Sequence, residues 1–205
     1  MSLFDLQFFG EVFVTFFVIL DPVGTIPLYL SLTSGHAPRT RRRKAWQAAA
    51  VSFVLIVVFA LFGQSILSYL GISVPSLQAA GGLLLLLVAL QLLTGKQEEP
   101  NEQARANVNV AFVPLGTPLL AGPGAIVASI VFVRQINGVG DGTALAAGLI
   151  AVHAVLWVAM RYSSGIIRVI REDGVELVTR ISGLLLSAIA VQLVADAIRA
   201  FVQSS

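Results

Sequence analysis

Long apolar segments alternate with short polar ones along this chain. Trp46 to Leu70 contains no charged residue, and neither does Leu77 to Thr94. At about 1.5 Å of rise per residue, each segment is long enough to cross a hydrocarbon core of about 30 Å as a helix. The pattern therefore predicts an all-α, polytopic membrane protein with six transmembrane helices. The expected spans are residues 6–33, 46–70, 77–94, 110–133, 143–160 and 181–202.

Composition supports a membrane protein and excludes several kinds of site. Of the 205 residues, 57% are hydrophobic and only 12% are charged, a balance far from that of an average soluble protein. The chain has no cysteine, which excludes disulfides, thiolate metal sites and cysteine nucleophiles. Its first residues include acidic side chains and no basic ones, which is not typical of a cleaved signal peptide. We therefore expect residues 1–205 to form a single transmembrane domain whose first span is retained.

Basic residues are concentrated in three connecting segments, residues 34–45, 95–109 and 161–180. Eleven of the 13 basic residues lie there, and only Arg134 and Arg199 lie elsewhere. Because basic loops stay in the cytoplasm, this bias predicts that both termini are extracytoplasmic and that the protein lies in the cell (inner) membrane. The run RTRRRK could also bind nucleic acid, but the topology rule already accounts for it, and we expect no nucleic-acid partner.

The two halves of the chain resemble each other when one is shifted by 101 residues. The shift aligns AVSFVLIV with AVHAVLWV, and it aligns Gly82 with Gly183. We interpret this as a repeat of about residues 6–104 and 107–205, although leucine-rich helices also align through composition alone. With three spans in each half, the second half would enter the membrane in the opposite orientation, as in many secondary transporters.

The first span of each half contains helix-breaking residues near its middle. The stretch ILDPVGTIPLYL includes Asp21, Pro22 and Gly24, and the same shift aligns Asp21-Pro22 with Gly122-Pro123. Proline removes a backbone donor, and glycine permits dihedral angles that a regular helix does not use. Backbone groups freed in hydrocarbon are tolerated only inside protein or beside a wet cavity, so both helices are predicted to be broken around a central site at the bilayer midplane. Ordinary proline kinks are the alternative.

The two breaks supply the candidate substrate site. Each proline suits the first turn of a second half-helix, so Asp21 and Gly122 are candidate N-caps, and the half-helix amides would attract a carboxylate. Asp21 either caps its half-helix or receives an ammonium group, a proton or a cation. Thr25 and Thr117 either supply hydroxyl groups or only back-bond to their helices. The candidate substrate-binding residues are Asp21, Pro22, Gly24, Thr25, Thr117, Gly122, Pro123 and Gly124.

His153, in the middle of the fifth span, is a candidate proton relay because histidine changes its charge near neutral pH. A neutral histidine that makes one interhelical hydrogen bond is an equally simple interpretation. We expect no metal site and no cofactor, since the sequence has no metal-ligand cluster such as H-E-x-x-H. It also lacks G-x-S-x-G and a second midplane acid beside Asp21, so we do not expect an enzyme.

The stretches DPVGTIPLYLSLT (21–33) and PLGTPLLAGPGAI (114–126) resemble the signatures of the MarC family of six-helix membrane proteins, also described as a neutral amino acid transporter group. The resemblance covers both motifs and nearly the whole length. It implies a multi-pass inner-membrane protein linked in some members to transport of small neutral amino acids such as glycine and alanine. The motif residues carried over are Asp21, Pro22, Gly24 and Pro27, with Pro114, Pro118, Gly122, Pro123 and Gly124 in the second half.

Together these inferences predict a secondary transporter. A zwitterionic amino acid would bind between the two broken helices, and access would alternate by movement between the repeats. A channel and a non-transporting membrane scaffold are the alternatives. The expected partners are a small neutral amino acid and the lipid bilayer, with coupling to H⁺ or Na⁺. The sequence also allows a homo-oligomer, and it leaves the exact substrate, the direction of transport and the coupling ion open.

Overall fold

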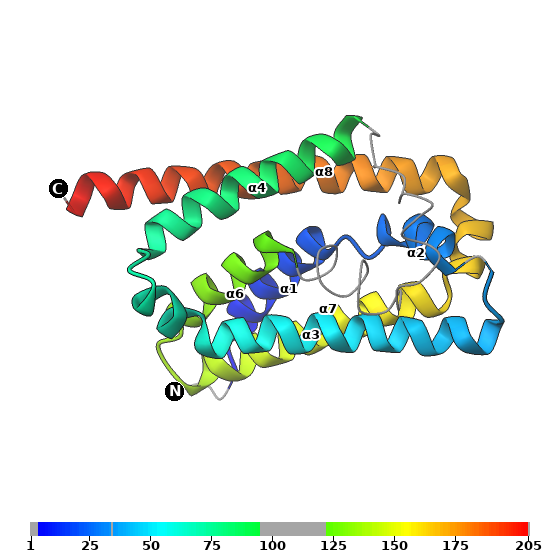
Figure 1. Cartoon of the computed structure of the whole chain (residues 1–205), viewed down its shortest axis with the longest axis horizontal. Helices are drawn as coiled ribbons and strands as arrows, with labels where there is room; N and C mark the ends of the chain where they lie inside the picture. The colour runs from blue at the N-terminus through cyan, green and yellow to red at the C-terminus, as the bar shows by residue number, and fades with distance from the viewer. Residues whose placement is uncertain (1–3, 34, 95–121, 205) are drawn as a thin grey trace.

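The computed structural model describes residues 4–33, 35–94 and 122–204, and throughout these ranges the regular structure is helical (Figure 1). The described helices are α1 (Leu6–Leu20), α2 (Thr25–Thr33), α3 (Pro38–Tyr69), α4 (Val74–Thr94), α6 (Pro123–Arg134), α7 (Val139–Arg161) and α8 (Ser163–Ser204). Four helical stretches are long and apolar enough to cross a membrane: α3, α4, α7 and the part of α8 from Asp173 to Gln203. Shorter apolar stretches lie in α1 and α6.

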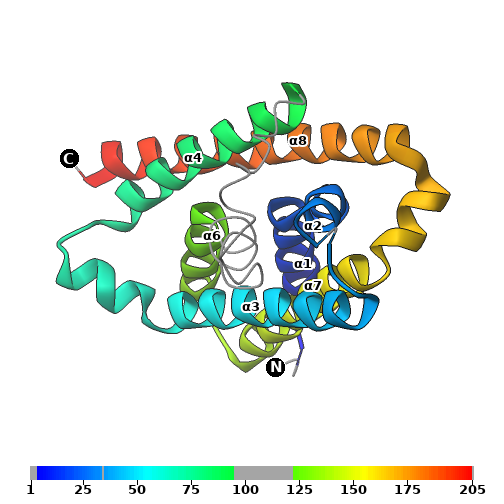
Figure 2. The same cartoon turned by 45° about the vertical axis from the view of Figure 1, so that its right-hand side comes forward.

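The helices are arranged with the shorter ones in the centre. Figures 1 and 2 show α4 and α8 on one side of the molecule, α3 and α7 on the other, and α1, α2 and α6 between them. One core cluster joins residues of α1, α2, α3, α6 and α7, among them Phe16, Tyr29 and Leu156. A second cluster joins Val18 of α1 to residues of α4 and α8. The short helices are therefore enclosed by the long ones.

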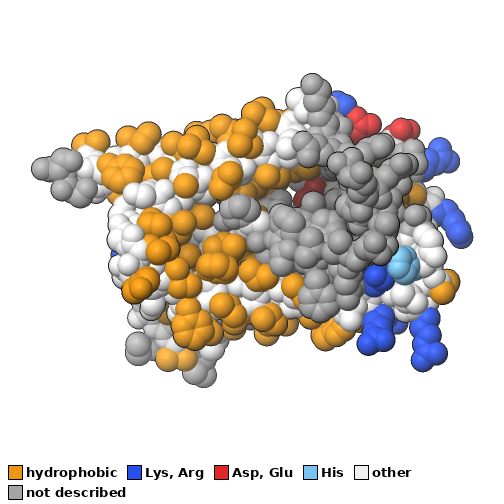
Figure 3. All heavy atoms as spheres, viewed as in Figure 1, with side chains coloured by type: hydrophobic (Ala, Val, Ile, Leu, Met, Phe, Trp, Pro, Cys, Tyr) orange, Lys and Arg blue, Asp and Glu red, His pale blue; other side chains and the backbone are white. Residues whose placement is uncertain are grey.

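The outer surface matches a chain that lies in lipid. Large hydrophobic side chains are exposed along the long helices, among them Val54, Leu61, Leu87 and Val191. In the view of Figure 3, hydrophobic side chains cover the left and central parts of the face that are drawn in colour, whereas most of the Lys and Arg side chains gather at the right-hand end. Both chain termini lie at the opposite end (Figure 1). A surface with apolar flanks and charges at its end is that of an integral, multi-pass membrane protein.

Two helices extend into segments that the sequence predicts as loops, and that prediction is wrong for most of their length. α3 begins at Pro38 and α8 at Ser163, with a kink inside α8 at Arg171 (φ 61°, ψ 169°), so most of residues 34–45 and 161–180 is helical. Hydropathy marks where the chain leaves the hydrocarbon, whereas a helix continues into water wherever its residues favour it. Pro38 suits the first turn of α3, and the Arg180–Glu176 ion pair spans one turn of α8. The predicted loop 95–109 lies outside the described residues.

Residues that are 101 positions apart make reciprocal contacts. Where α4 crosses α8, a Cβ atom built on Gly82 would lie 2.7 Å from the carbonyl oxygen of Ala190. A Cβ atom built on Gly183 would lie 3.2 Å from that of Ala89. Each residue of the second contact is the 101-residue counterpart of a residue in the first, which is the pattern of a two-fold arrangement. Small residues let two membrane helices approach this closely.

The fourth predicted span is described only from Gly122 onward. Its part within the described ranges is α6, and residues 110–121 lie outside them. The count of six spans and the inverted repeat therefore stay predictions, whereas the all-helical, multi-pass architecture is confirmed.

Candidate functional site

The first apolar segment is interrupted at the residues that the sequence singles out. α1 ends at Leu20 and α2 begins at Thr25. Asp21 closes α1 as its C-cap, in the left-handed region with φ 37° and ψ 71°, and its N–H donates to the carbonyl of Phe17. Glycine usually takes this position because it has no Cβ, and aspartate is among the few other residues that adopt it. The interruption therefore has a local cause in the sequence.

Asp21 also opens the turn that leads into α2. Its carbonyl oxygen accepts from the N–H of Thr25 at 2.9 Å, and its Oδ1 accepts from the N–H of Gly24 at 3.0 Å. A side-chain oxygen that binds the amide three residues later is N-cap geometry, and Pro22 then occupies the first position, where no backbone donor is needed. One residue thus ends one helix and begins the next.

The carboxylate of Asp21 is buried between this turn and α8. Only 7% of the residue is exposed, and Ser182 on α8 donates its hydroxyl to Oδ1 at 3.3 Å. The other oxygen, Oδ2, lies directly over Gly24, where a Cβ atom would collide with it. The hydroxyl oxygen of Thr179 lies 3.0 Å from the same Cβ position. Gly24 is therefore required here because it makes room for the carboxylate.

Oδ2 of Asp21 has no hydrogen-bond partner within the described ranges. Buried polar atoms are nearly always paired, and an unpaired carboxylate oxygen away from water is costly. Oδ2 of Asp21 and the hydroxyls of Ser182 and Thr179 form a group of oxygen atoms. They come from two elements far apart in the sequence, the turn after α1 and helix α8. Such a group can accept hydrogen bonds from an ammonium ion, hold a proton or bind a small cation.

Thr25 and Thr117 were the candidate hydroxyl donors. Thr25 is buried, and its Oγ1 donates to the carbonyl of Leu20 at 3.2 Å. This bond crosses the interruption from α2 to α1 and pairs a carbonyl that the end of α1 leaves free. A role of Thr25 in substrate binding stays a prediction. Thr117 lies outside the described residues.

The second candidate break lies at the start of α6. Gly122 is the N-cap of this helix, and Pro123 occupies its first turn, as the sequence predicts. The carbonyl of Gly122 accepts from the N–H of Ala125 at 3.0 Å, and Pro123 has no N–H. A glycine has no side chain to cap the remaining first-turn amide, that of Gly124. A Cβ atom on Gly124 would collide with the side chain of Leu85 on α4. The residues before Gly122 lie outside the described ranges, so an interruption of that helix stays a prediction.

The two candidate helix starts approach the same apolar cluster. Val18, one turn before Asp21, belongs to a cluster with Leu85 and Leu186, and Leu85 also lies against Gly124. Leu85 and Leu186 are 101 residues apart, so the cluster pairs counterparts from the two halves. The two helix starts therefore neighbour one buried apolar cluster.

His153 lies in a separate environment between α3 and α7. Its Nδ1 is 2.8 Å from the carbonyl of Leu149, and its Nε2 is 3.4 Å from the hydroxyl of Ser52. Because a carbonyl can only accept, Nδ1 carries the proton, and Nε2 is then free to accept from Ser52. In the described part of the chain, no hydrogen bond joins this pair to Asp21. The geometry favours the interhelical hydrogen bond, and a proton relay stays a prediction.

Sequence reasoning missed Thr179 and Ser182. Both are buried on α8, three positions apart, so they share one helix face. The sequence held a weak signal, since the 101-residue shift aligns Ser182 with Gly81, directly beside the Gly82–Gly183 pair. Thr179 was overlooked because it fell in a segment predicted as a loop.

Comparison with known proteins identifies the family. A family model described as MarC family integral membrane protein matches residues 6–202. The chain is 34% identical over 200 residues to the UPF0056 membrane protein MJ1677 of Methanocaldococcus jannaschii, covering 95% of this chain and 98% of that one. It is 32% identical over 207 residues to the UPF0056 membrane protein YhcE of Escherichia coli, covering 97% and 95%. No solved structure matches. The chain belongs to the MarC family of integral membrane proteins.

Proposed function

We propose that this protein is a secondary transporter of small neutral amino acids, such as glycine and alanine, across the inner membrane, and that it is not an enzyme. The observation that carries the proposal is Asp21. Its carboxylate is buried at a helix interruption, with one oxygen paired and the other without a partner among the described residues. A helix start in this protein can do without a charge, as Gly122 does for α6. We therefore infer that the charged carboxylate of Asp21 binds a ligand.

The substrate would be held at its two charged ends. Its ammonium group would bind Oδ2 of Asp21, beside the hydroxyl of Thr179. Its carboxylate would bind the N–H of Gly124 in the first turn of α6, where Gly122 provides no capping side chain and the helix end is partly positive. Pro123 has no N–H, and Ala125 already donates to Gly122. The neighbouring cluster of Val18, Leu85 and Leu186 is apolar, which favours a small uncharged side chain.

The arrangement of the halves supports alternating access. We propose that residues 6–104 and 107–205 form an inverted repeat, which the reciprocal contacts of Gly82 and Gly183 across α4 and α8 support. The basic end of the molecule would face the cytoplasm, with both termini outside. Movement of one repeat against the other would open the site to each side in turn.

Reconstitution in liposomes tests the proposal. We expect saturable uptake of labelled glycine, alanine or serine, with a rate that depends on a proton or sodium gradient. Asp21→Asn keeps the capping oxygen but removes the charge, so uptake should weaken roughly ten- to a hundredfold while the protein stays folded. Asp21→Ala should harm both uptake and folding. The matched control is Asp5→Asn, because Asp5 also caps a helix, with Oδ1 accepting from Phe8 at 2.8 Å.

One result would contradict the ligand role of Asp21, and two would contradict the function itself. Normal uptake and gradient dependence in Asp21→Asn would reduce the aspartate to a structural cap. Flux that does not saturate and does not distinguish stereoisomers would indicate a channel. The absence of both uptake and ligand-dependent thermal stabilisation, for all three amino acids, would indicate a membrane scaffold.

A further inference from the structure

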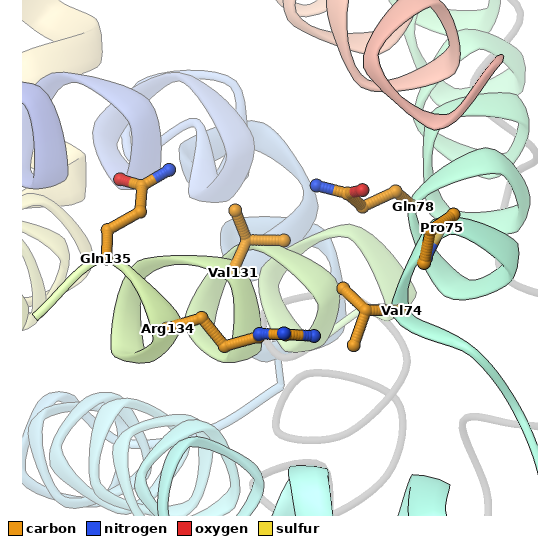
Figure 4. A pocket seen from close by; sticks show the side chains of 6 residues that line it. All are labelled: Val74, Pro75, Gln78, Val131, Arg134 and Gln135. Atoms are coloured by element: carbon orange, nitrogen blue, oxygen red, sulfur yellow. The ribbon is translucent and has the colours of Figure 1, made fainter. Parts of the chain in front are cut away.

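A cavity away from Asp21 lies where the first turns of α4 meet the last turn of α6. Its volume is about 290 Å³, and its lining residues are Val74, Pro75, Gln78, Val131, Arg134 and Gln135 (Figure 4). None of these residues belongs to the candidate site described above. The volume is close to the lower limit of roughly 300–1,000 Å³ for ligand pockets. Arg134 and Gln135 are exposed and the other lining residues are half-buried, so this is an open cavity that a small solute could enter from outside.

The lining combines a cation with amide groups and an apolar wall. Figure 4 shows Gln78 pointing from α4 toward α6, and Arg134 extending along α6 toward Val74. In the described part of the chain, Arg134 forms no ion pair. A guanidinium group binds a carboxylate through two parallel hydrogen bonds, and glutamine amides can donate to it as well. Val74, Pro75 and Val131 form the apolar wall, and the open side of the cavity leaves the ammonium group of the solute in contact with water.

The position of Arg134 is unusual for a basic residue in this protein. The cavity is formed by the α6 end near the α6–α7 connection, away from the basic run that begins α3. Arg134 is one of only two basic residues outside the three basic segments. Basic residues are disfavoured on the extracytoplasmic side, so the topology rule does not account for Arg134. A ligand would.

Beside the cavity, α4 and α6 pack against each other along a contact that leads to the start of α6. Gln78 and Val131 line the cavity, and one turn further along, a Cβ atom on Gly81 would collide with the side chain of Val127. Another turn on, Leu85 closes over Gly124 at the start of α6. The two helices therefore pack tightly between the cavity and the proposed carboxylate position, about 10 Å apart at about 1.5 Å per residue.

We propose that this cavity is an outer binding site for the carboxylate end of a small amino acid, with Arg134 as its principal ligand. This inference rests on the proposed function, since the amino acid bound here would be the one that is transported. The solute binds here first and reaches the inner site when α4 and α6 separate along the contact of Gly81 with Val127. The outer and inner sites are thus the two ends of one helix contact.

Equilibrium binding to the full-length protein in phosphatidylcholine nanodiscs tests the inference independently of transport. The measurement uses labelled alanine and the Asp21→Asn background, in which the inner site is weakened. We expect alanine to bind still, alaninamide, which has no carboxylate, to compete poorly, and Arg134→Gln to weaken binding about tenfold with an unchanged melting temperature. The control is Arg199→Gln, because Arg199 is exposed and pairs with Asp196 at 3.6 Å.

In liposomes, Arg134→Gln should raise KM about tenfold and leave kcat within twofold. Equal alanine binding by Arg134→Gln and the Asp21→Asn background would overturn the inference, as would equal competition by alaninamide. Loss of alanine binding when phosphatidylglycerol replaces part of the phosphatidylcholine would assign Arg134 to a lipid phosphate instead. If liposomes show no uptake but these binding differences hold, the outer site stands and the transport proposal fails.

Discussion

The start of α2 and the start of α6 are counterparts under the 101-residue shift, yet their chemistry differs. At the start of α2, the carboxylate of Asp21 meets a hydroxyl of α8, that of Ser182. At the start of α6, Gly122 has no side chain, and the α4 residue that corresponds to Ser182 is Gly81, which packs against Val127. One start carries charge and hydroxyl groups, and the other carries close packing. On the proposed function, these two helix starts would bind opposite ends of a zwitterion.

The glycines near the two helix starts show the same difference in chemistry. Gly24 makes room for an oxygen of Asp21, whereas Gly124 makes room for the side chain of Leu85. The same residue type therefore supports a polar site in one half and an apolar contact in the other. Substitutions that fill these spaces test the polar role and the packing role separately.

The largest effect is expected for Gly24→Ala. Its Cβ atom would collide with Oδ2 of Asp21 and displace the carboxylate, so uptake should fall by about a hundredfold, as for loss of a charged hydrogen bond. Initial rates of amino acid uptake in liposomes measure this decrease. Gly10→Ala on α1 is the control, because no atom lies within 4 Å of its Cβ position. Wild-type uptake by Gly24→Ala would mean that the position of the carboxylate does not matter.

Gly81→Ala tests the packed side. Its Cβ atom would lie 2.9 Å from two carbons of Val127, and overpacking of this kind costs about 1–3 kcal/mol. The melting temperature in detergent should drop by several degrees, at about 2–4 °C for each kcal/mol. In Gly142→Ala on α7, where the Cβ position is open, it should stay the same or rise. Equal melting temperatures for the two variants would show that α4 and α6 are loosely packed here.

A smaller effect is expected for Ser182→Ala. This change removes the donor to Oδ1 of Asp21, a long hydrogen bond of 3.3 Å worth about 1 kcal/mol, so uptake should fall roughly fivefold. Ser187→Ala on the same helix is the control, since its hydroxyl is exposed and donates to the carbonyl of Leu184. If both variants lose the same activity, the contact between α8 and the start of α2 plays no part in uptake.

The smallest effect is expected for His153→Gln. The carboxamide can still donate to Leu149 and accept from Ser52, and nothing in the described ranges connects this pair to Asp21. Uptake should stay within about twofold, at ordinary hydrogen-bond energies, with unchanged dependence on a proton gradient. Uptake measured with and without a proton gradient tests this expectation. Loss of the gradient dependence in His153→Gln would identify His153 as a proton relay.

The sequence predicted the features that local chemistry determines. The interruption after Leu20 follows from Pro22 and Gly24, and the N-cap role of Asp21 follows from its position before a proline. The all-helical, multi-pass fold follows from the length of the apolar segments.

Features that depend on which helix faces which were not predictable. Ser182 binds Asp21 across 161 positions of sequence, and nothing in the apolar pattern says which turn of α8 faces this interruption. The extension of α3 to Pro38 was missed for a different reason, because charge ends a hydropathy segment without ending a helix. The cavity at Arg134 is formed by the last turn of α6 and the first turns of α4, whose proximity is a tertiary contact.

The shortness of α1 has a consequence for biosynthesis. Its 15 residues span about 22 Å at about 1.5 Å per residue, less than the roughly 30 Å of the hydrocarbon core. As the chain leaves the ribosome, α1 therefore cannot complete a crossing without α2. The basic start of α3 follows only a few residues after Thr33 and would be retained on the cytoplasmic side. The translocon would thus release α1, α2 and α3 into the lipid as one helical hairpin.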